Sequence, residues 1–225
     1  MDSKITVGGV LLSSINFAMQ QNYVPVIRDV TVNNDSDRVL ENVTLKITFE
    51  PNFAKEFSYN IQSIAPHSSV EINPVNIRLS TDFLFSLTEK LVGEVQFTLY
   101  ENDAVVFQCD KTIELLAYDQ WGGVLLIPEI IAAFVTPNHP KISEVISAAS
   151  GYLKQWGKYP SFTGYQTRNP DNVKAQMAAI YAALQSAGII YNSPPASYET
   201  VGQRIRLPHI VLQQKQGTCL DLAVL

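Results

Sequence analysis

The order of apolar and polar residues changes character once along the chain. From about Ile15 to Leu116 the two kinds alternate, most clearly in Val43 to Phe49 and in Val95 to Leu99. A period of two predicts strands that bury one face. Beyond residue 118 the period becomes 3.6, which predicts amphipathic helices. The pattern therefore predicts an α+β chain with two domains.

The first domain, 1–118, is expected to contain about seven short strands with no helix between them. Turn clusters such as Asn33 to Asp37 separate them. That arrangement predicts a β-sandwich, and it resembles an immunoglobulin or fibronectin type III module without the Cys pair and Trp of antibody domains. Cys109 is expected to face the core. The predicted strands are Ser14 to Met19, Val24 to Val32, Val43 to Phe49, Glu56 to Ile61, Val70 to Leu79, Val95 to Leu99 and Val105 to Leu115.

The second domain, 119–225, begins at the joint Asp119-Gln120-Trp121-Gly122-Gly123 and continues with two predicted helices. The first runs from Ile142 to Trp156. The second is capped by Asn169, has Pro170 in its first turn and ends at Gly188. Residues 203–216, with Pro208, are expected to be an irregular path. The buried stripe of the second helix is predicted to be Val173, Met177, Ile180, Tyr181 and Leu184.

Composition excludes several function classes. A chain of 225 residues with 46% hydrophobic content is expected to bury a substantial core. It has no leader pattern and no apolar run of membrane-spanning length, so we expect a cytoplasmic protein. Cys109 and Cys219 form no disulfide framework, and no spacing suggests a metal or cofactor site.

The charge is distributed unevenly. Residues 1–118 carry 8 Lys and Arg against 15 Asp and Glu, whereas residues 119–225 carry 8 against 6. An acidic first part argues against a nucleic-acid surface there, because binding phosphates requires clustered basic residues. The expected partners are proteins or further domains of the same polypeptide.

The last ten residues, Gln216 to Leu225, contain the strongest chemical signal. Gly217 and Thr218 lead into Cys219, which opens an apolar run at helical spacing. Thr218 is expected to cap this helix, with Asp221 as the reciprocal half of a capping box. In the first turn, unpaired N–H groups and the helix dipole favour a thiolate. Cys219 is therefore a candidate nucleophile, although free cysteines are also often buried structural residues.

The segment from Gln213 to Ala223 resembles the nucleophile region of transglutaminase-like proteins, which have the papain-like cysteine fold. The order of domains is similar to the N-terminal part of large bacterial superfamily I helicase-related proteins. The motifs that carry this wider resemblance are Gln120-Trp121-Gly122-Gly123, Pro170-Asp171-Asn172-Val173 and Gln216-Gly217-Thr218-Cys219-Leu220-Asp221. The sequence contains no phosphate-binding Gly-x-x-x-x-Gly-Lys-Ser/Thr motif.

The resemblance implies a Cys-His-Asp triad in which His and Asp follow the Cys, and here the sequence departs from the pattern. His67, His139 and His209 all precede Cys219. Without a base, acyl transfer lacks a proton acceptor, so we expect this chain to be catalytically inert. Gln213, six residues before the Cys, matches the position of an oxyanion-hole glutamine, or it is a solvated loop residue.

Three functions follow as hypotheses. The first is a non-catalytic accessory or interaction region of a larger, helicase-related cytoplasmic protein. The alternative is the front part of a transglutaminase-like thiol enzyme acting on amide or peptide bonds, with Cys219 as nucleophile. Direct binding of nucleic acid is the third and the least favoured by the charge.

Overall fold

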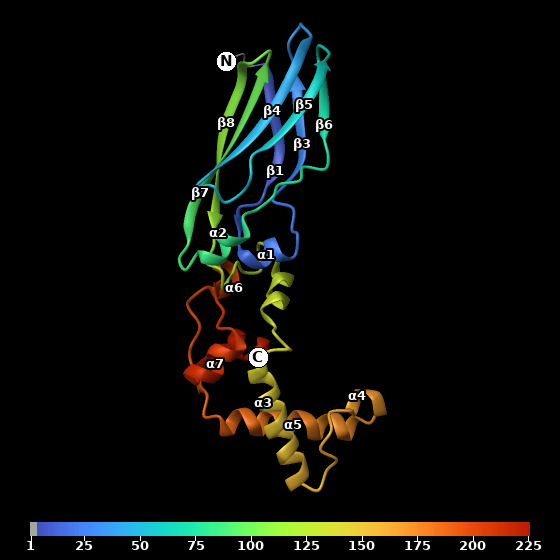
Figure 1. Cartoon of the computed structure of the whole chain (residues 1–225), viewed down its shortest axis with the longest axis vertical. Helices are drawn as coiled ribbons and strands as arrows, with labels where there is room; N and C mark the ends of the chain where they lie inside the picture. The colour runs from blue at the N-terminus through green and yellow to red at the C-terminus, as the bar shows by residue number, and fades with distance from the viewer. Residues whose placement is uncertain (1–3) are drawn as a thin grey trace. The chain divides into compact units, whose positions relative to one another are not determined.

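The computed structural model describes residues 4–225 and shows a mixed α+β protein with several sheets (Figure 1). The chain divides into two compact units. The first comprises Met1–Pro128 with Thr200–Gly202, and the second comprises Glu129–Glu199 with Gln203–Leu225.

Two sheets form most of the first unit. Their strands are β1 (Ile5–Leu11), β2 (Ser14–Ile15), β3 (Ile27–Asn34), β4 (Leu40–Glu50), β5 (Phe57–Ile64), β6 (Ser68–Ile72), β7 (Leu91–Glu101) and β8 (Ala104–Leu115). One sheet has the order β1-β3-β6 and the other β2-β8-β7-β4-β5. All neighbours are antiparallel except β2 and β8, which are parallel.

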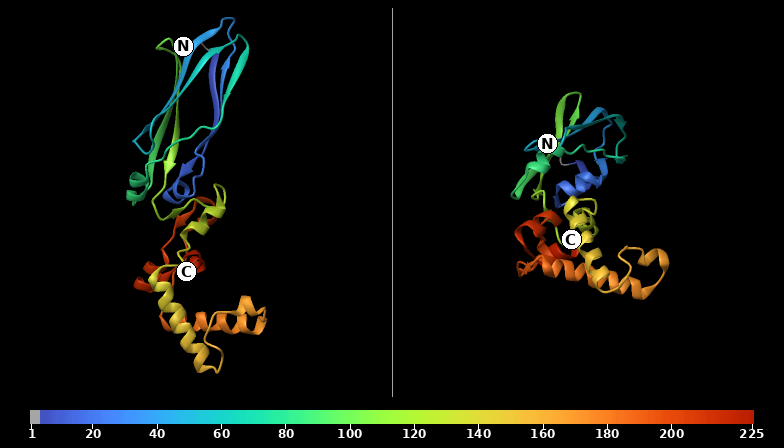
Figure 2. Two further views of the ribbon diagram at one scale, coloured as in Figure 1. Left: turned by 45° about the vertical axis from the view of Figure 1, so that its right-hand side comes forward. Right: turned by 60° about the horizontal axis from the view of Figure 1, so that its bottom comes forward.

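The two sheets lie against each other, with β1 beside β8 and β5 beside β6 (Figure 2). Residues at every second position of the strands are buried between them, as the alternation predicted. This core consists of large aliphatic and aromatic side chains. Its fully buried members include Ile5, Ile15, Ile27, Leu40, Leu45, Ile47, Phe53, Ile64, Ile72 and Leu99.

Two helices interrupt this unit, so the expectation of an all-strand first domain was wrong. The predicted strand from Ser14 to Met19 ends at Ile15, and α1 (Phe17–Gln21) follows, because the buried Asn16 side chain accepts a hydrogen bond from the Met19 N–H at 2.8 Å. Ser80 caps α2 (Thr81–Ser86) in the same way.

Strand limits also differ from the predicted ones. β6 ends at Ile72 rather than Leu79, just before Pro74, which has no N–H to donate to a ladder. β3 starts at Ile27 rather than Val24. β1 was not predicted, because its central Gly8-Gly9 pair hides the alternation. The short β9 (Gln120–Trp121) follows β8 in the chain.

Helices dominate the chain from Pro128 onward, together with three two-residue strands. The elements are η1 (Pro128–Phe134), α3 (Pro140–Gln155), α4 (Gly164–Thr167), α5 (Pro170–Ser186), β10 (Ile190–Tyr191), α6 (Tyr198–Val201), β11 (Gln203–Arg204), α7 (Pro208–Gln214), β12 (Gln216–Gly217) and α8 (Cys219–Val224). Both predicted long helices are present, as α3 and α5. The Asn169 side chain caps α5 by accepting from the Asp171 and Asn172 N–H groups.

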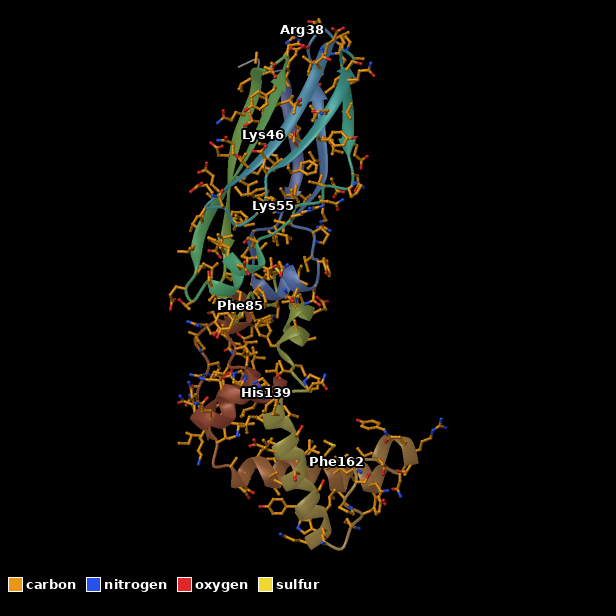
Figure 3. The ribbon with its side chains drawn as sticks, in the orientation of Figure 1. Arg38, Lys46, Lys55, Phe85, His139 and Phe162 are labelled. Carbon is orange, nitrogen blue, oxygen red and sulfur yellow. The ribbon has the colours of Figure 1, made fainter. Side chains whose placement is uncertain are left out.

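The contact between α3 and α5 is made by small side chains. Ala149 and Leu153 of α3 meet Ala179 and Ala183 of α5, and Phe162 packs at the edge of this cluster (Figure 3). The predicted stripe of α5 was wrong at two positions, since Met177 and Tyr181 are 65% and 69% exposed. Alanine side chains allow two helices to approach closely, and the larger side chains of Met177 and Tyr181 therefore lie outside the contact between α3 and α5.

The segment 203–216 is not the irregular path that we expected. Pro208 occupies the first position of α7, where its missing N–H is not needed. The residue that argued against a central strand is therefore the one that begins a helix.

Candidate functional site

Cys219 is the first residue of α8, as predicted. The chain reaches it through β12, which runs parallel to β10 with Ile190 paired to Gln216 and Tyr191 to Gly217. Gly217 is tightly packed, because a Cβ there would lie 3.2 Å from the Cβ of Asp221. The turn therefore favours glycine immediately before the helix cap.

The predicted capping box is present. The Thr218 hydroxyl accepts a hydrogen bond from the Asp221 N–H at 3.4 Å, and the Asp221 carboxylate accepts from the Thr218 N–H at 2.8 Å. The helix start is thus fixed by two reciprocal bonds on either side of Cys219.

Asp221 has a second role that the sequence did not reveal. Its side chain is fully buried, and it accepts hydrogen bonds from the Arg206 N–H at 2.8 Å and from Arg206 Nη1 at 3.0 Å. A buried carboxylate needs several donors to offset its lost hydration. These bonds tie the segment before α7 to the start of α8, and so hold Cys219 in place.

The thiol itself is partly exposed and is not sealed in the core. Its one hydrogen-bond partner in the described part of the chain is Tyr198, whose hydroxyl lies 3.8 Å from Sγ. This hydrogen bond raises the pKa of Tyr198 above its ordinary value, and the nearby Glu199 carboxylate adds to the effect.

Gln203 is the second polar residue at the cap that the sequence did not single out. It is buried, and its Nε2 donates to the Thr218 hydroxyl at 3.0 Å. Its Oε1 has no partner within residues 4–225. Several glutamines lie between 203 and 216, and only the fold distinguishes this one from the rest.

The structure does not bring Gln213 into contact with Cys219 in the described residues. Gln213 is exposed in α7 and lines a hollow of about 550 Å³ together with His139 and His209. Its proposed oxyanion role stays a prediction.

Two histidines, His139 and His209, lie against each other, and the third, His67, lies in the first unit. His209, expected in a loop, lies in α7 and stacks on His139 with ring centroids 4.6 Å apart and planes 11° apart. His139 caps α3 through Nδ1, and Figure 3 shows it at the start of that helix. His67 is in the first unit, beside Asp37. No imidazole in residues 4–225 is hydrogen-bonded to Cys219.

The described part of the chain contains no group of three or more His, Cys, Asp or Glu side chains that is placed to hold a metal ion. None of its helices combines the length and apolar character required to cross a bilayer. A comparison with protein-family models gave no match, and neither did a comparison with curated proteins.

Proposed function

We propose that this chain is a non-catalytic, protein-binding accessory region of a larger, helicase-related cytoplasmic protein. The environment of Cys219 is the observation that carries the non-catalytic part. Its hydrogen-bond partner within residues 4–225 is the Tyr198 phenol, and none of the described imidazoles is bonded to the thiol. Acyl transfer by a thiol requires a group that removes its proton and later protonates the leaving amine.

The arrangement of strands supports the binding part. In sequence order the eight strands divide so that β1, β3 and β6 form one sheet, while β4, β5, β7, β8 and the short β2 form the other. Immunoglobulin-like modules likewise place their first, second and fifth main strands opposite the third, sixth and seventh. The fourth strand differs, because the constant-type module places it with the first sheet and β5 lies in the second. Because a fold does not by itself fix a function, the binding role needs its own test.

A second candidate is the front part of a transglutaminase-like thiol enzyme. The partly exposed thiol in the first turn of a capped helix favours it. In that reaction the Cys219 sulfur attacks an amide carbonyl, the C–N bond breaks, and a thioester and a free amine result. The amine leaves with a proton, which a neighbouring acid has to supply.

An amide-exchange assay separates the two candidates. The chain is incubated with a blocked glutamine dipeptide and hydroxylamine, and hydroxamate is measured over pH 6 to 9 for wild type, Cys219→Ala and, as a control, Cys109→Ala. We expect wild type to produce no more hydroxamate than Cys219→Ala. Turnover that Cys219→Ala abolishes and Cys109→Ala preserves would establish the thiol enzyme.

Binding of nucleic acid is tested separately. We expect titration with single- and double-stranded DNA to give no affinity that falls with salt, because the first unit is acidic. A steep salt dependence would replace the protein-binding function with a nucleic-acid one.

A further inference from the structure

Within residues 4–225, one long edge of the first unit has no partner strand over most of its length. β8 pairs with β7 from Leu115 to Ala104, but on its other side β2 covers only Glu114 and Leu115. Residues 104–112, here named the β8 edge, lie at the rim of the five-stranded sheet (Figure 1). Strand edges present main-chain donors and acceptors that can bind another strand.

The hydrogen bonds next to β2 show in which direction the main-chain N–H and C=O groups of the β8 edge point. The Glu114 N–H donates to the Ser13 carbonyl at 2.9 Å, on the side away from β7. Strand groups repeat every second residue, and the ladder to β7 is regular from Phe107 to Leu115. The N–H and C=O of Thr112, Asp110 and Gln108 therefore point toward the open side. In the described part of the chain, none of them has a main-chain partner there.

The inner face of the sheet is also incompletely covered at β8. On β7, Val95, Phe97 and Leu99 are buried. Their β8 partners are Lys111, Cys109 and Phe107, which point to the same face and are only half-buried. The inner face of β7 is thus covered, whereas the inner face of β8 keeps apolar surface that a ligand can contact.

A hollow and a charge lie at the same place. Between β8 and the segment from β1 to β2 is a space of about 590 Å³, lined by Gly9 to Ser13 and by Asp110 to Thr112. The β1–β3 register shifts at the same place, between Gly8 and Val10. The Lys111 Nζ lies 5.5 Å from the centre of the Phe97 ring. Within residues 4–225 this ammonium group has no carboxylate partner.

We propose that the β8 edge binds an extended segment of a different polypeptide, which adds to the five-stranded sheet as a further strand. The inference rests on the protein-binding function proposed above and gives that function a site. The edge amides and carbonyls supply main-chain hydrogen bonds. The segment presents apolar residues at alternate positions to cover Phe107 and Cys109, and a carboxylate that pairs with Lys111.

A second copy of this chain fits the edge less well. If two β8 edges paired antiparallel and centred on Asp110, the middle residue of the three that point outward, the two Asp110 carboxylates would lie opposite each other. Like charges directly opposite each other are destabilising. An inward-pointing lysine on an edge strand discourages pairing with any strand that brings no acid to it, and β8 itself brings none to that face. The charges therefore favour a foreign segment that carries its own acid.

The test begins with the whole chain as bait for a displayed library of random twelve-residue peptides. An enriched peptide is then synthesised, and its Kd is measured by fluorescence anisotropy. We expect apolar residues at every second position with an acidic residue among them. Asp110→Pro removes one outward N–H without breaking the ladder to β7, and it is expected to weaken binding about tenfold or more. Asp110→Ala, which keeps that N–H, is the matched control.

A second arm does not depend on the folding of the proline variant. The same peptide, N-methylated at every second amide, is expected to lose binding in one methylation pattern and to keep it in the other, because only one set of amides faces β8. Bound peptide should also slow alkylation of Cys109 by iodoacetamide.

The outcomes separate the two proposals. Peptides that bind equally well to wild type and Asp110→Pro, and in both methylation patterns, would overturn the β8 edge as the binding site. The protein-binding function would then still hold. Enrichment of no peptide at all would overturn both. A concentration-dependent dimer that Asp110→Pro dissolves would replace the foreign segment with a second copy.

Discussion

The two units bury apolar surface in different ways. Between its sheets the first unit encloses large side chains such as Leu45, Ile47 and Leu99, all fully buried. In the second unit, α3 and α5 meet through three alanines and one leucine. Met177 and Tyr181 of α5 stay exposed. Burial per side chain, and hence the hydrophobic contribution to stability, is greater in the first unit.

In the second unit, polar contacts are concentrated at the start of α8. There the buried Asp221 carboxylate binds Thr218 and Arg206 together and fixes the start of α8. The first unit is thus stabilised by many dispersed apolar contacts, whereas the start of α8 in the second unit is held by a few concentrated polar ones. Substitutions should therefore have their largest effects at different kinds of residue in the two units.

The largest effect is expected from Asp221→Ala. It removes the acceptor of three donors, including the buried Thr218 N–H, so the free energy of unfolding should fall by about 3–5 kcal/mol, at roughly 1–2 kcal/mol for each donor left unpaired. Urea denaturation followed by circular dichroism measures this. Asp171→Ala, an exposed acid in the first turn of α5, is the control and should change stability little. Equal losses for the two variants would contradict the anchoring role of Asp221.

Ile47→Ala tests the dispersed core of the first unit. Deleting a fully buried Ile side chain leaves a cavity and should cost about 2–5 kcal/mol. Met177→Ala deletes a side chain of similar size from the exposed side of α5 and should stay within about 0.5 kcal/mol. Urea denaturation measures the free energy of unfolding of both variants. A large loss of stability in Met177→Ala would show that this side chain is covered in solution.

Two glycine substitutions give smaller effects of opposite sign. In β7, a Cβ on Gly93 would lie 2.9 Å from the Phe53 ring, so Gly93→Ala should destabilise by about 1–3 kcal/mol. In α3, a Cβ on Gly151 would meet nothing within 4 Å. Gly151→Ala should therefore stabilise by about 0.5–1 kcal/mol through its higher helix propensity. Thermal unfolding measures both, and a loss for Gly151→Ala would contradict the open side of α3.

The smallest effect concerns the Cys109 thiol on the β8 edge. Burial raises its pKa above the ordinary value, so the folded protein retains this proton at a pH where an unfolded chain begins to lose it. Stability should fall slightly as the pH rises above about 8.5. In Cys219→Ser, the rate of iodoacetamide labelling should still be rising where that of a cysteine peptide has levelled off. Matching pH profiles would show that the β8 edge leaves the thiol fully solvated.

Local patterns gave a good account of individual elements. The alternation in β4 and β7, the Asn169 cap of α5 and the Thr218–Asp221 capping box depend on residues close together in the chain, and all were predicted. α1 and α2 were missed because their caps, Asn16 and Ser80, stand within apolar stretches that also fit strands. The stripe of α5 was misjudged because periodicity does not tell which apolar residues a partner helix covers.

At the candidate site, the sequence determined that a cysteine would open a capped helix, since a cap involves only neighbouring residues. Its resemblance to a transglutaminase-like nucleophile stays an expectation. Three contacts could not be predicted from local patterns: Arg206 pairs with Asp221, Tyr198 is the partner of the thiol, and His139 stacks on His209. These contacts join residues distant in the chain, and they form only once the intervening elements have packed. The unpaired β8 edge has the same origin, because it depends on the order of strands in the sheet.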